Sequence, residues 1–177
     1  RTAVRGNSTR AVILRPEDPN LAALLKSAGY RTGCIGKWGL GTPDNTSNPN
    51  DIGFDYFFGY VDMWHAHNFY PEFLIRNGHV EKLRNEVASR WKPFQIPGKA
   101  QGGRGVAVKR IDYAPDLLVA EAEKFIRENK EAPFFLMHAL NTPHANNEAG
   151  SRGMEVPELG EFEKMDWPVA EKGFAVM

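Results

Sequence analysis

A helix followed by a short apolar strand and then a polar loop occurs twice in this chain of 177 residues. The first helix is predicted over 20–28 with a strand over 30–36, and the second over 112–129 with a strand over 133–140. This recurrence, with few alternating strands between, favours an α/β layer fold over a β-sandwich or a helix bundle. Because sites in such sheets form beyond the carboxyl ends of the strands, the residues that follow each strand become the candidates for function.

The first predicted helix is short and amphipathic. Asp18 is expected as its N-cap with Pro19 at the first helical position, and Gly29 is expected directly after its end. Four apolar residues recur on one face of this helix: Leu21, Leu24, Leu25 and Ala28.

The region between the two repeats has three recognisable patterns. Residues 54–70 are dense in aromatic side chains, which favours core packing under a long loop over the wall of a binding site. A hairpin is predicted over 72–83, with Asn77 and Gly78 at its turn. Residues 84–109 contain many prolines and glycines and are expected to form a surface insertion.

Both predicted strands are expected to be buried. The strand over 133–140 is mostly apolar, as is typical of a strand covered on both faces of a parallel sheet, and His138 inside it is expected to be a hydrogen-bonded core residue. Cys34 lies in the strand over 30–36, where we expect a packed thiol. Since it is the single cysteine, an internal disulfide and a thiolate zinc cluster are excluded.

Charge and hydropathy restrict the possible partners. Lysine and arginine number 22, as do aspartate and glutamate, so a broad basic face for nucleic acid is not expected. No apolar run approaches the roughly 20 residues of a membrane-spanning helix. The chain begins without an initiator methionine and ends in what resembles the opening of a helix, so we expect a fragment of a longer protein.

Two candidate residues follow the ends of the predicted strands, in the loops that begin there. Lys37 follows the first strand, between glycines, and could present a positive charge to an anion; the alternative is a solvated loop lysine. His144 follows the second strand and could protonate a leaving oxygen or bind an oxyanion; the alternative is a loop histidine bonded to the backbone.

A second pair of imidazoles lies in the aromatic segment. His65 and His67 are expected on the same side of an extended stretch, where they fit the wall of a polar substrate pocket. With only Asp62 nearby the metal signal is weak, and exposed loop histidines are the alternative. No established nucleophile motif occurs in the sequence.

Residues 29–41 closely resemble the second signature of the sulfatases, the arylsulfatase-type branch of the alkaline phosphatase superfamily. That signature reads Gly-Tyr-x-Thr-x-x-x-Gly-Lys-Trp-His-Leu-Gly, and Gly39 is the one departure, in place of its histidine. Residues 53–60 are similar to the family's Gly-Phe-Asp-x-Phe-x-Gly segment, and 133–144 to its strand leading to an active-site histidine. The matching signature positions are Gly29, Tyr30, Thr32, Gly36, Lys37, Trp38, Leu40 and Gly41.

The resemblance implies that residues 1–177 are part of a sulfatase catalytic domain, an alkaline-phosphatase-like mixed or parallel sheet between helices, incomplete at both ends. In the family a Cys/Ser-x-Pro-x-Arg motif supplies a formylglycine nucleophile, and Asp-Asp and Asp-Asn pairs hold calcium. The sequence has none of these motifs in the context that the family requires. Its one Asp-Asn pair, Asp44-Asn45, lies outside that context. Both groups are therefore expected outside this chain, which is expected to be inactive in isolation. The family also implies export to the periplasm, the extracellular space or the lysosome.

Two functional residues carry over from the family. Lys37 matches the lysine that binds a sulfate oxygen, and His144 matches the histidine near the ester oxygen. Many relatives have a histidine at the position of Gly39 that contacts the formylglycine, and His65 or His67 is our candidate to replace it. The expected function is hydrolysis of an aryl or carbohydrate sulfate ester. The alternatives are a non-catalytic relative that binds sulfated glycans and, with less support, a phosphoester hydrolase.

Overall fold

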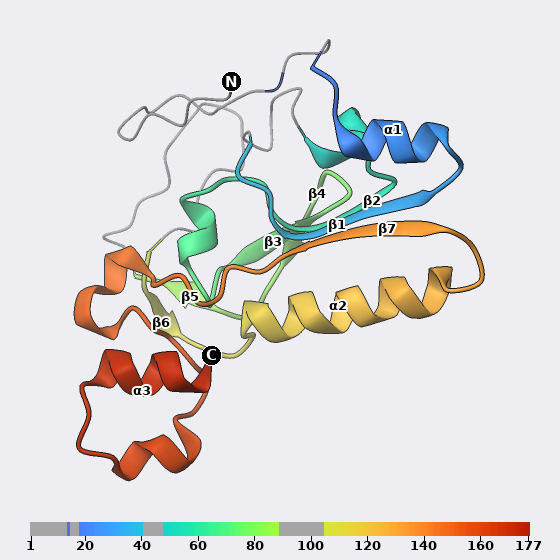
Figure 1. Ribbon diagram of the computed structural model, residues 1–177. Helices are drawn as coiled ribbons and strands as arrows, with labels where there is room; N and C mark the ends of the chain where they lie inside the picture. Colours follow the sequence, from blue (N-terminus) through green and yellow to red (C-terminus); the bar gives the residue numbers. More distant parts are fainter. Residues whose placement is uncertain (1–13, 15–17, 41–47, 89–104) are drawn as a thin grey trace.

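A mixed β-sheet with a helix on each face lies at the centre of the computed structural model (Figure 1). The structure describes residues 14, 18–40, 48–88 and 105–177. Five strands are hydrogen-bonded in the order β4-β3-β2-β1-β7, and helices α1 and α2 lie on opposite sides of this sheet (Figure 1). The expected α/β architecture, with a mixed sheet between helices, is confirmed.

Parallel pairing brings the ends of three strands to one edge of the sheet. β1 (Arg31–Lys37) pairs in parallel with β2 (Tyr56–Tyr60) on one side and with β7 (Phe134–Ala139) on the other. An antiparallel hairpin of β3 (Phe73–Arg76) and β4 (His79–Lys82) extends the sheet beyond β2, as the sequence predicted. Residues that follow β1 and β7 therefore leave the sheet at the same edge.

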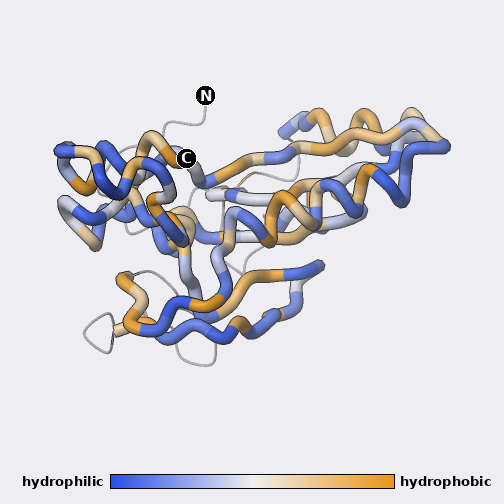
Figure 2. The backbone as a smooth tube through the Cα atoms, turned by 90° about the horizontal axis from the view of Figure 1, so that it is seen from below, coloured by the Kyte–Doolittle hydropathy of each residue, from blue (hydrophilic) through white to orange (hydrophobic). Residues whose placement is uncertain are grey.

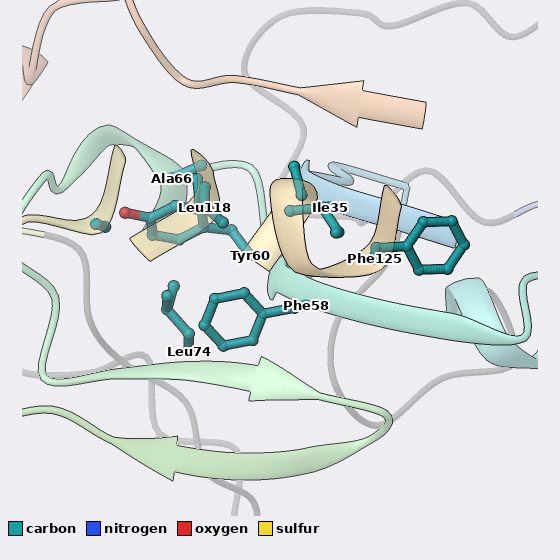
Figure 3. Close-up of a cluster of buried hydrophobic side chains, with 9 residues drawn as sticks. Ile35, Phe58, Tyr60, Ala66, Leu74, Leu118 and Phe125 are labelled. Carbon is teal, nitrogen blue, oxygen red and sulfur yellow. The ribbon is translucent and has the colours of Figure 1, made fainter. Parts of the chain in front are cut away.

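Alternation along β1 divides the core into two layers. Cys34 and Ile35 are both fully buried, and they face opposite sides of the sheet because successive side chains of a strand alternate. On the face covered by α1 (Leu21–Ser27), Cys34 packs in a cluster with Ala22, Phe54, Phe57, Val61 and Ile75. On the face covered by α2 (Ala114–Asn129), Ile35 packs in a cluster with Phe58, Tyr60, Leu74, Leu118 and Phe125 (Figure 3). The prediction of core packing for the aromatic segment is confirmed.

Short elements connect and flank this sheet: η1 (Pro49–Ile52), η2 (His65–His67), β5 (Glu86–Val87), β6 (Ala107–Lys109), η3 (Asn147–Arg152), η4 (Gly160–Lys164) and α3 (Val169–Val176). β5 and β6 form a separate two-stranded ribbon near the two ends of the predicted surface insertion, 84–109. Its centre, 89–104, lies outside the described residues, so the insertion stays a prediction.

The first helix differs from the sequence prediction in its start and in its buried face. Its N-cap is Asn20, not Asp18, because Asn20 has an extended backbone and its Oδ1 accepts a hydrogen bond of 2.8 Å from the Ala23 amide. Leu21 and Leu24 are 56% and 65% exposed, whereas the small Ala22 is buried. The helix packs through its backbone, since a Cβ on Gly53 would lie 2.6 Å from the Ala23 nitrogen.

The second helix and strand also depart from the prediction in detail. α2 begins at Ala114, two residues after the predicted start; Asp112 lies before it, with its carboxylate 2.5 Å from Arg84 and its amide donating to Asn85 Oδ1. β7 is half-buried instead of covered on both faces, since in the described part of the chain it has a neighbouring strand on one side only. His138 is consequently exposed and is not a core residue. Hydrophilic and hydrophobic residues are mixed along the helices (Figure 2), as expected where one helix face packs on a core.

Candidate active site

Lys37 stands at the carboxyl end of β1, where the backbone geometry requires the glycine before it. Gly36 has φ +117°, and a Cβ there would lie 1.9 Å from the carbonyl oxygen of Ala139 on β7. Lys37 is half-buried, and burial lowers the pKa of its ammonium group. The strand end therefore holds a cation in partly desolvated surroundings, where its field on a nearby anion is stronger than in open water.

Thr32 and Asp55, one from each of the two family motifs, are hydrogen-bonded to each other at the start of β1. The Thr32 hydroxyl donates to the carbonyl oxygen of Gly53 at 2.7 Å, and the Thr32 amide donates to Asp55 Oδ2 at 3.0 Å. The Asp55 amide donates in return to Thr32 Oγ1 at 3.0 Å, and Lys26 lies 2.8 Å from the Asp55 carboxylate. This interlocking explains why a threonine in the first motif accompanies an aspartate in the second.

His67 lies among polar and aromatic side chains that come from separate segments. The residue is 6% exposed, and its ring stacks on the His144 ring, with centroids 4.9 Å apart and an angle of 15° between planes. The indole of Trp64 contacts it edge-on at 5.5 Å. On another side, His67 Nδ1 lies 3.3 Å from Oε2 of Glu148.

The charges around His67 place Lys37 in the same neighbourhood. Burial lowers the pKa of the His67 imidazole, the Glu148 carboxylate raises it, and the nearby His144 and Lys37 lower it, with a net decrease. Lys37 and His144 therefore both lie close enough to His67 to disfavour a positive charge on it, although the three residues are far apart in the sequence. Three of the four residues predicted as a site are brought together.

The fourth, His65, lies elsewhere. The residue is 4% exposed, and its ring packs against Tyr60 and Phe73, with centroids 4.9 and 4.5 Å away. Burial lowers the pKa of this imidazole to about 3. The expectation that both histidines lie on one side of an extended stretch is wrong. They belong to a 3-10 helix, η2, in which residues two apart are rotated by about 240° at three residues per turn.

Asp62 produces this local helix. Its Oδ1 accepts hydrogen bonds from the amides of Trp64 at 2.8 Å and of His65 at 2.9 Å, just before η2 begins. A polar side chain that satisfies the free amides of a first turn favours the helical conformation. The carboxylate thus stabilises the start of the turn that carries both histidines.

His144 follows β7 and is the exposed member of the group. Its Nδ1 lies 2.7 Å from the carbonyl oxygen of Ala145, which can only accept, so Nδ1 carries a proton. Nε2 is then an acceptor in the neutral ring and a second donor in the protonated ring. This tautomer suits an exchange of protons with a bound molecule.

Glu148 and the residues that hold it were not anticipated from the sequence. Asn146 is fully buried; its side-chain amide donates to Glu155 Oε2 at 2.7 Å and to the carbonyl oxygen of Gly105 at 2.9 Å. Its Oδ1 accepts from the Glu148 amide at 3.2 Å, and Arg110 lies 2.5 Å from the Glu155 carboxylate. The polar run directly after His144 was the available signal.

The described residues do not fit a calcium ion or a thiol nucleophile. Among them there is no group of three or more His, Cys, Asp or Glu side chains that could hold a metal ion. Cys34 is fully buried, and burial raises the pKa of its thiol to about 12. No helix in the described part of the chain is long and apolar enough to cross a membrane.

Fold and site together define an α/β protein with a cation and two stacked imidazoles beyond the carboxyl ends of adjacent parallel strands. Comparison with known proteins gives the family. The sulfatase family model matches residues 3–157, and the chain belongs to the sulfatase family. The resemblance of residues 29–41 to the sulfatase signature therefore predicted the family correctly, and the family assignment is confirmed.

Individual relatives agree with this assignment. The chain is 31% identical over 205 residues to an N-acetylgalactosamine-6-O-sulfatase of Bacteroides thetaiotaomicron; the alignment covers 85% of this chain and 38% of that protein. It is 26% identical over 212 residues to a steryl-sulfatase of Rattus norvegicus; the alignment covers 89% of this chain and 37% of that protein. The chain thus spans less than two fifths of the length of these relatives.

Solved structures share the fold. The PsFucS1 sulfatase from Pseudoalteromonas sp. matches with a TM-score of 0.57 and 20% identity, over 95% of this chain and 34% of that chain. The structure described as Ps i-CgsB matches with a TM-score of 0.57 and 24% identity, over 87% of this chain and 32% of that chain. At these identities the likeness concerns the fold alone.

Proposed function

We propose that this chain forms part of the active site of a sulfuric ester hydrolase that acts on a sulfated carbohydrate. The observation that carries the proposal is the convergence of Lys37, His67 and His144 at one edge of the sheet. A cation next to imidazoles suits an ester that is anionic before the reaction and needs its leaving oxygen protonated. The similarity to an N-acetylgalactosamine-6-O-sulfatase supports a carbohydrate over an aryl ester.

Lys37 binds sulfate oxygens in this proposal. The tight backbone at Gly36 fixes the main chain of this half-buried lysine at the strand end. A positive charge in partly desolvated surroundings stabilises negative charge on the transferring group.

His144 serves the leaving oxygen. Because Nδ1 is engaged with the Ala145 carbonyl, Nε2 is the atom that exchanges a proton with the ligand. Its exposure allows contact with a large substrate such as a sugar.

His67 takes the place of the imidazole that many relatives have at the position of Gly39. Gly39 has φ +76°, a left-handed backbone conformation that suits glycine, and without a side chain it cannot supply that imidazole. His67 comes from η2 and stacks on His144, whereas His65 is enclosed in the core. Of the two candidates, the geometry supports His67.

A formylglycine nucleophile and calcium belong to this proposal as groups supplied by residues outside those described, since the described residues do not fit them. Export to the periplasm, the extracellular space or the lysosome is proposed on the family alone.

The test measures sulfate release from a sulfated N-acetylgalactosamine by the full-length protein and its variants. Lys37→Ala, His144→Ala and His67→Ala are each expected to lower kcat/KM by about 100-fold or more. His79→Ala, at the exposed first residue of β4, is the matched control and is expected to stay within about twofold.

Three outcomes would contradict parts of the proposal. Tight binding of the sulfated sugar without release of sulfate would make the protein a non-catalytic glycan binder. Faster hydrolysis of phosphate esters would favour the phosphoester alternative. A His67→Ala variant within about twofold of wild type would remove His67 from the site.

A further inference from the structure

Glu148 is a buried acid with no role in the function proposed above. Its side chain is 9% exposed and lies 3.3 Å from Nδ1 of His67, whose own side chain is 7% exposed. A carboxylate removed from water to this degree is costly unless it is paired. Here the partner is an imidazole 81 residues earlier in the chain.

The contact determines which nitrogen of His67 carries a proton. An ionised carboxylate only accepts hydrogen bonds, so Nδ1 is the donor and Nε2 remains for the ligand. The same arrangement, in which a carboxylate fixes the tautomer of an imidazole, orients metal-bound and catalytic histidines generally.

The charges that face His67 come from three segments. Lys37 at the end of β1 and His144 after β7 both disfavour a positive charge on His67, and Glu148 in η3 favours one. Trp64 adds an uncharged ring edge. Among these neighbours Glu148 is the one anionic group.

We propose that Glu148 is a positioning residue of the active site: its carboxylate fixes the His67 ring through Nδ1, presents Nε2 to the sulfated ligand and keeps His67 able to bind a proton beside Lys37 and His144. This inference rests on the proposed function, because it assigns Glu148 a task within that site.

The backbone around Glu148 is held independently of its carboxylate. The Glu148 amide donates to Asn146 Oδ1, and Asn146 is anchored by Glu155 and Gly105. Replacing the carboxylate alone is therefore expected to leave η3 in place. Glu148→Gln keeps an oxygen that can accept from Nδ1 and removes the charge, whereas Glu148→Ala removes both.

The experiment follows the His67 imidazole by NMR in the full-length protein labelled with ¹⁵N-histidine, with the signal assigned by its loss in His67→Ala. Glu148→Gln is expected to lower the pKa of His67 by about one unit, the size typical of an opposite charge at this range. The limb of the pH profile of kcat/KM that His67→Ala abolishes is expected to move to lower pH by the same amount. Glu148→Ala is expected to lower kcat/KM at least about tenfold.

The matched control is Glu158→Gln, an exposed glutamate ten residues further on, which is expected to change neither the titration nor the profile. An unchanged His67 titration in Glu148→Gln, within about 0.3 units, would overturn the inference even if activity fell. Because the titration needs no turnover, it remains decisive in a protein that releases no sulfate, so failure of the proposed function is seen separately.

Discussion

Replacing Asn146 by alanine removes three side-chain hydrogen bonds from beneath the candidate active site. Two are donated to Glu155 and to the carbonyl oxygen of Gly105, and one is accepted from the Glu148 amide. A neutral hydrogen bond contributes about 1 kcal/mol net and one to a charged group about 1.5–3 kcal/mol. The losses add to about 3–5 kcal/mol, a large part of the stability of an ordinary domain.

The surroundings favour the lower end of this range. A cavity of about 500 Å³ lies between β6, η3 and α3 and is lined in part by Glu148 and Glu155. Water that enters from it can satisfy some of the groups left by Asn146, which reduces the penalty of unpaired buried atoms. We therefore expect a loss of about 3 kcal/mol in the free energy of unfolding.

Urea unfolding of the full-length protein at neutral pH measures the effect. Asn147→Ala is the matched control, since Asn147 is adjacent and exposed, and is expected to stay within about 0.5 kcal/mol of wild type. Asn146→Asp places a second carboxylate beside Glu155 and is expected to be the most destabilised variant at pH 7. Its deficit should shrink as the pH falls, because two adjacent carboxyl groups can share a proton. Equal stability of Asn146→Ala and Asn147→Ala would refute this account.

Two further substitutions test the frame around Lys37. Gly36→Ala is expected to destabilise the protein by several kcal/mol, about the cost of a large core change, since its Cβ would lie 1.9 Å from the Ala139 oxygen and φ is +117°; a thermal midpoint within about 2 °C of wild type would contradict this. Burial raises the pKa of Asp55, but hydrogen bonds and charge from Lys26 and Thr32 lower it by more, so the net pKa lies below the usual value. The ionised carboxylate therefore stabilises the fold fully at pH values above the pKa of the unfolded chain. Asp55→Asn is expected to lower the free energy of unfolding by about 1 kcal/mol at pH 7 and by progressively less as the pH falls below about 4. An equal loss above and below this pH would exclude the carboxylate charge as its cause.

The sequence predicted the order of elements well because strong local signals agreed with each other. The longer helix, the hairpin with its Asn-Gly turn and both strands were correctly placed. Errors arose where tertiary contacts decide the outcome. Leu21 and Leu24 have the spacing of a buried stripe, yet α1 packs through Ala22 and its own backbone on Gly53.

For the site, position at a strand end was sufficient to find Lys37 and His144, because adjacent parallel strands end at one edge. His65 and His67 could not be separated from the sequence, since their difference depends on a 3-10 turn at whose start the Asp62 side chain accepts two amide hydrogen bonds. For Glu148, the polar run after His144 marks the segment but does not single out the residue. Its proximity to His67 results from tertiary packing and is held by the Asn146–Glu155 contact.

An anionic ligand would change the charge balance at this edge. Lys37 is positive and Glu148 is negative, and Lys37 and His144 both disfavour a positive charge on His67. An added sulfate ester brings a negative charge that favours protonation of His67, so on the proposed function ligand binding and proton uptake are linked. The proton that the leaving oxygen needs would then be recruited by the same charge that binds to Lys37. On the proposed function a neutral sugar would bring no such charge, so selectivity for the sulfated form is expected to follow from charge before any contact with the sugar ring is made.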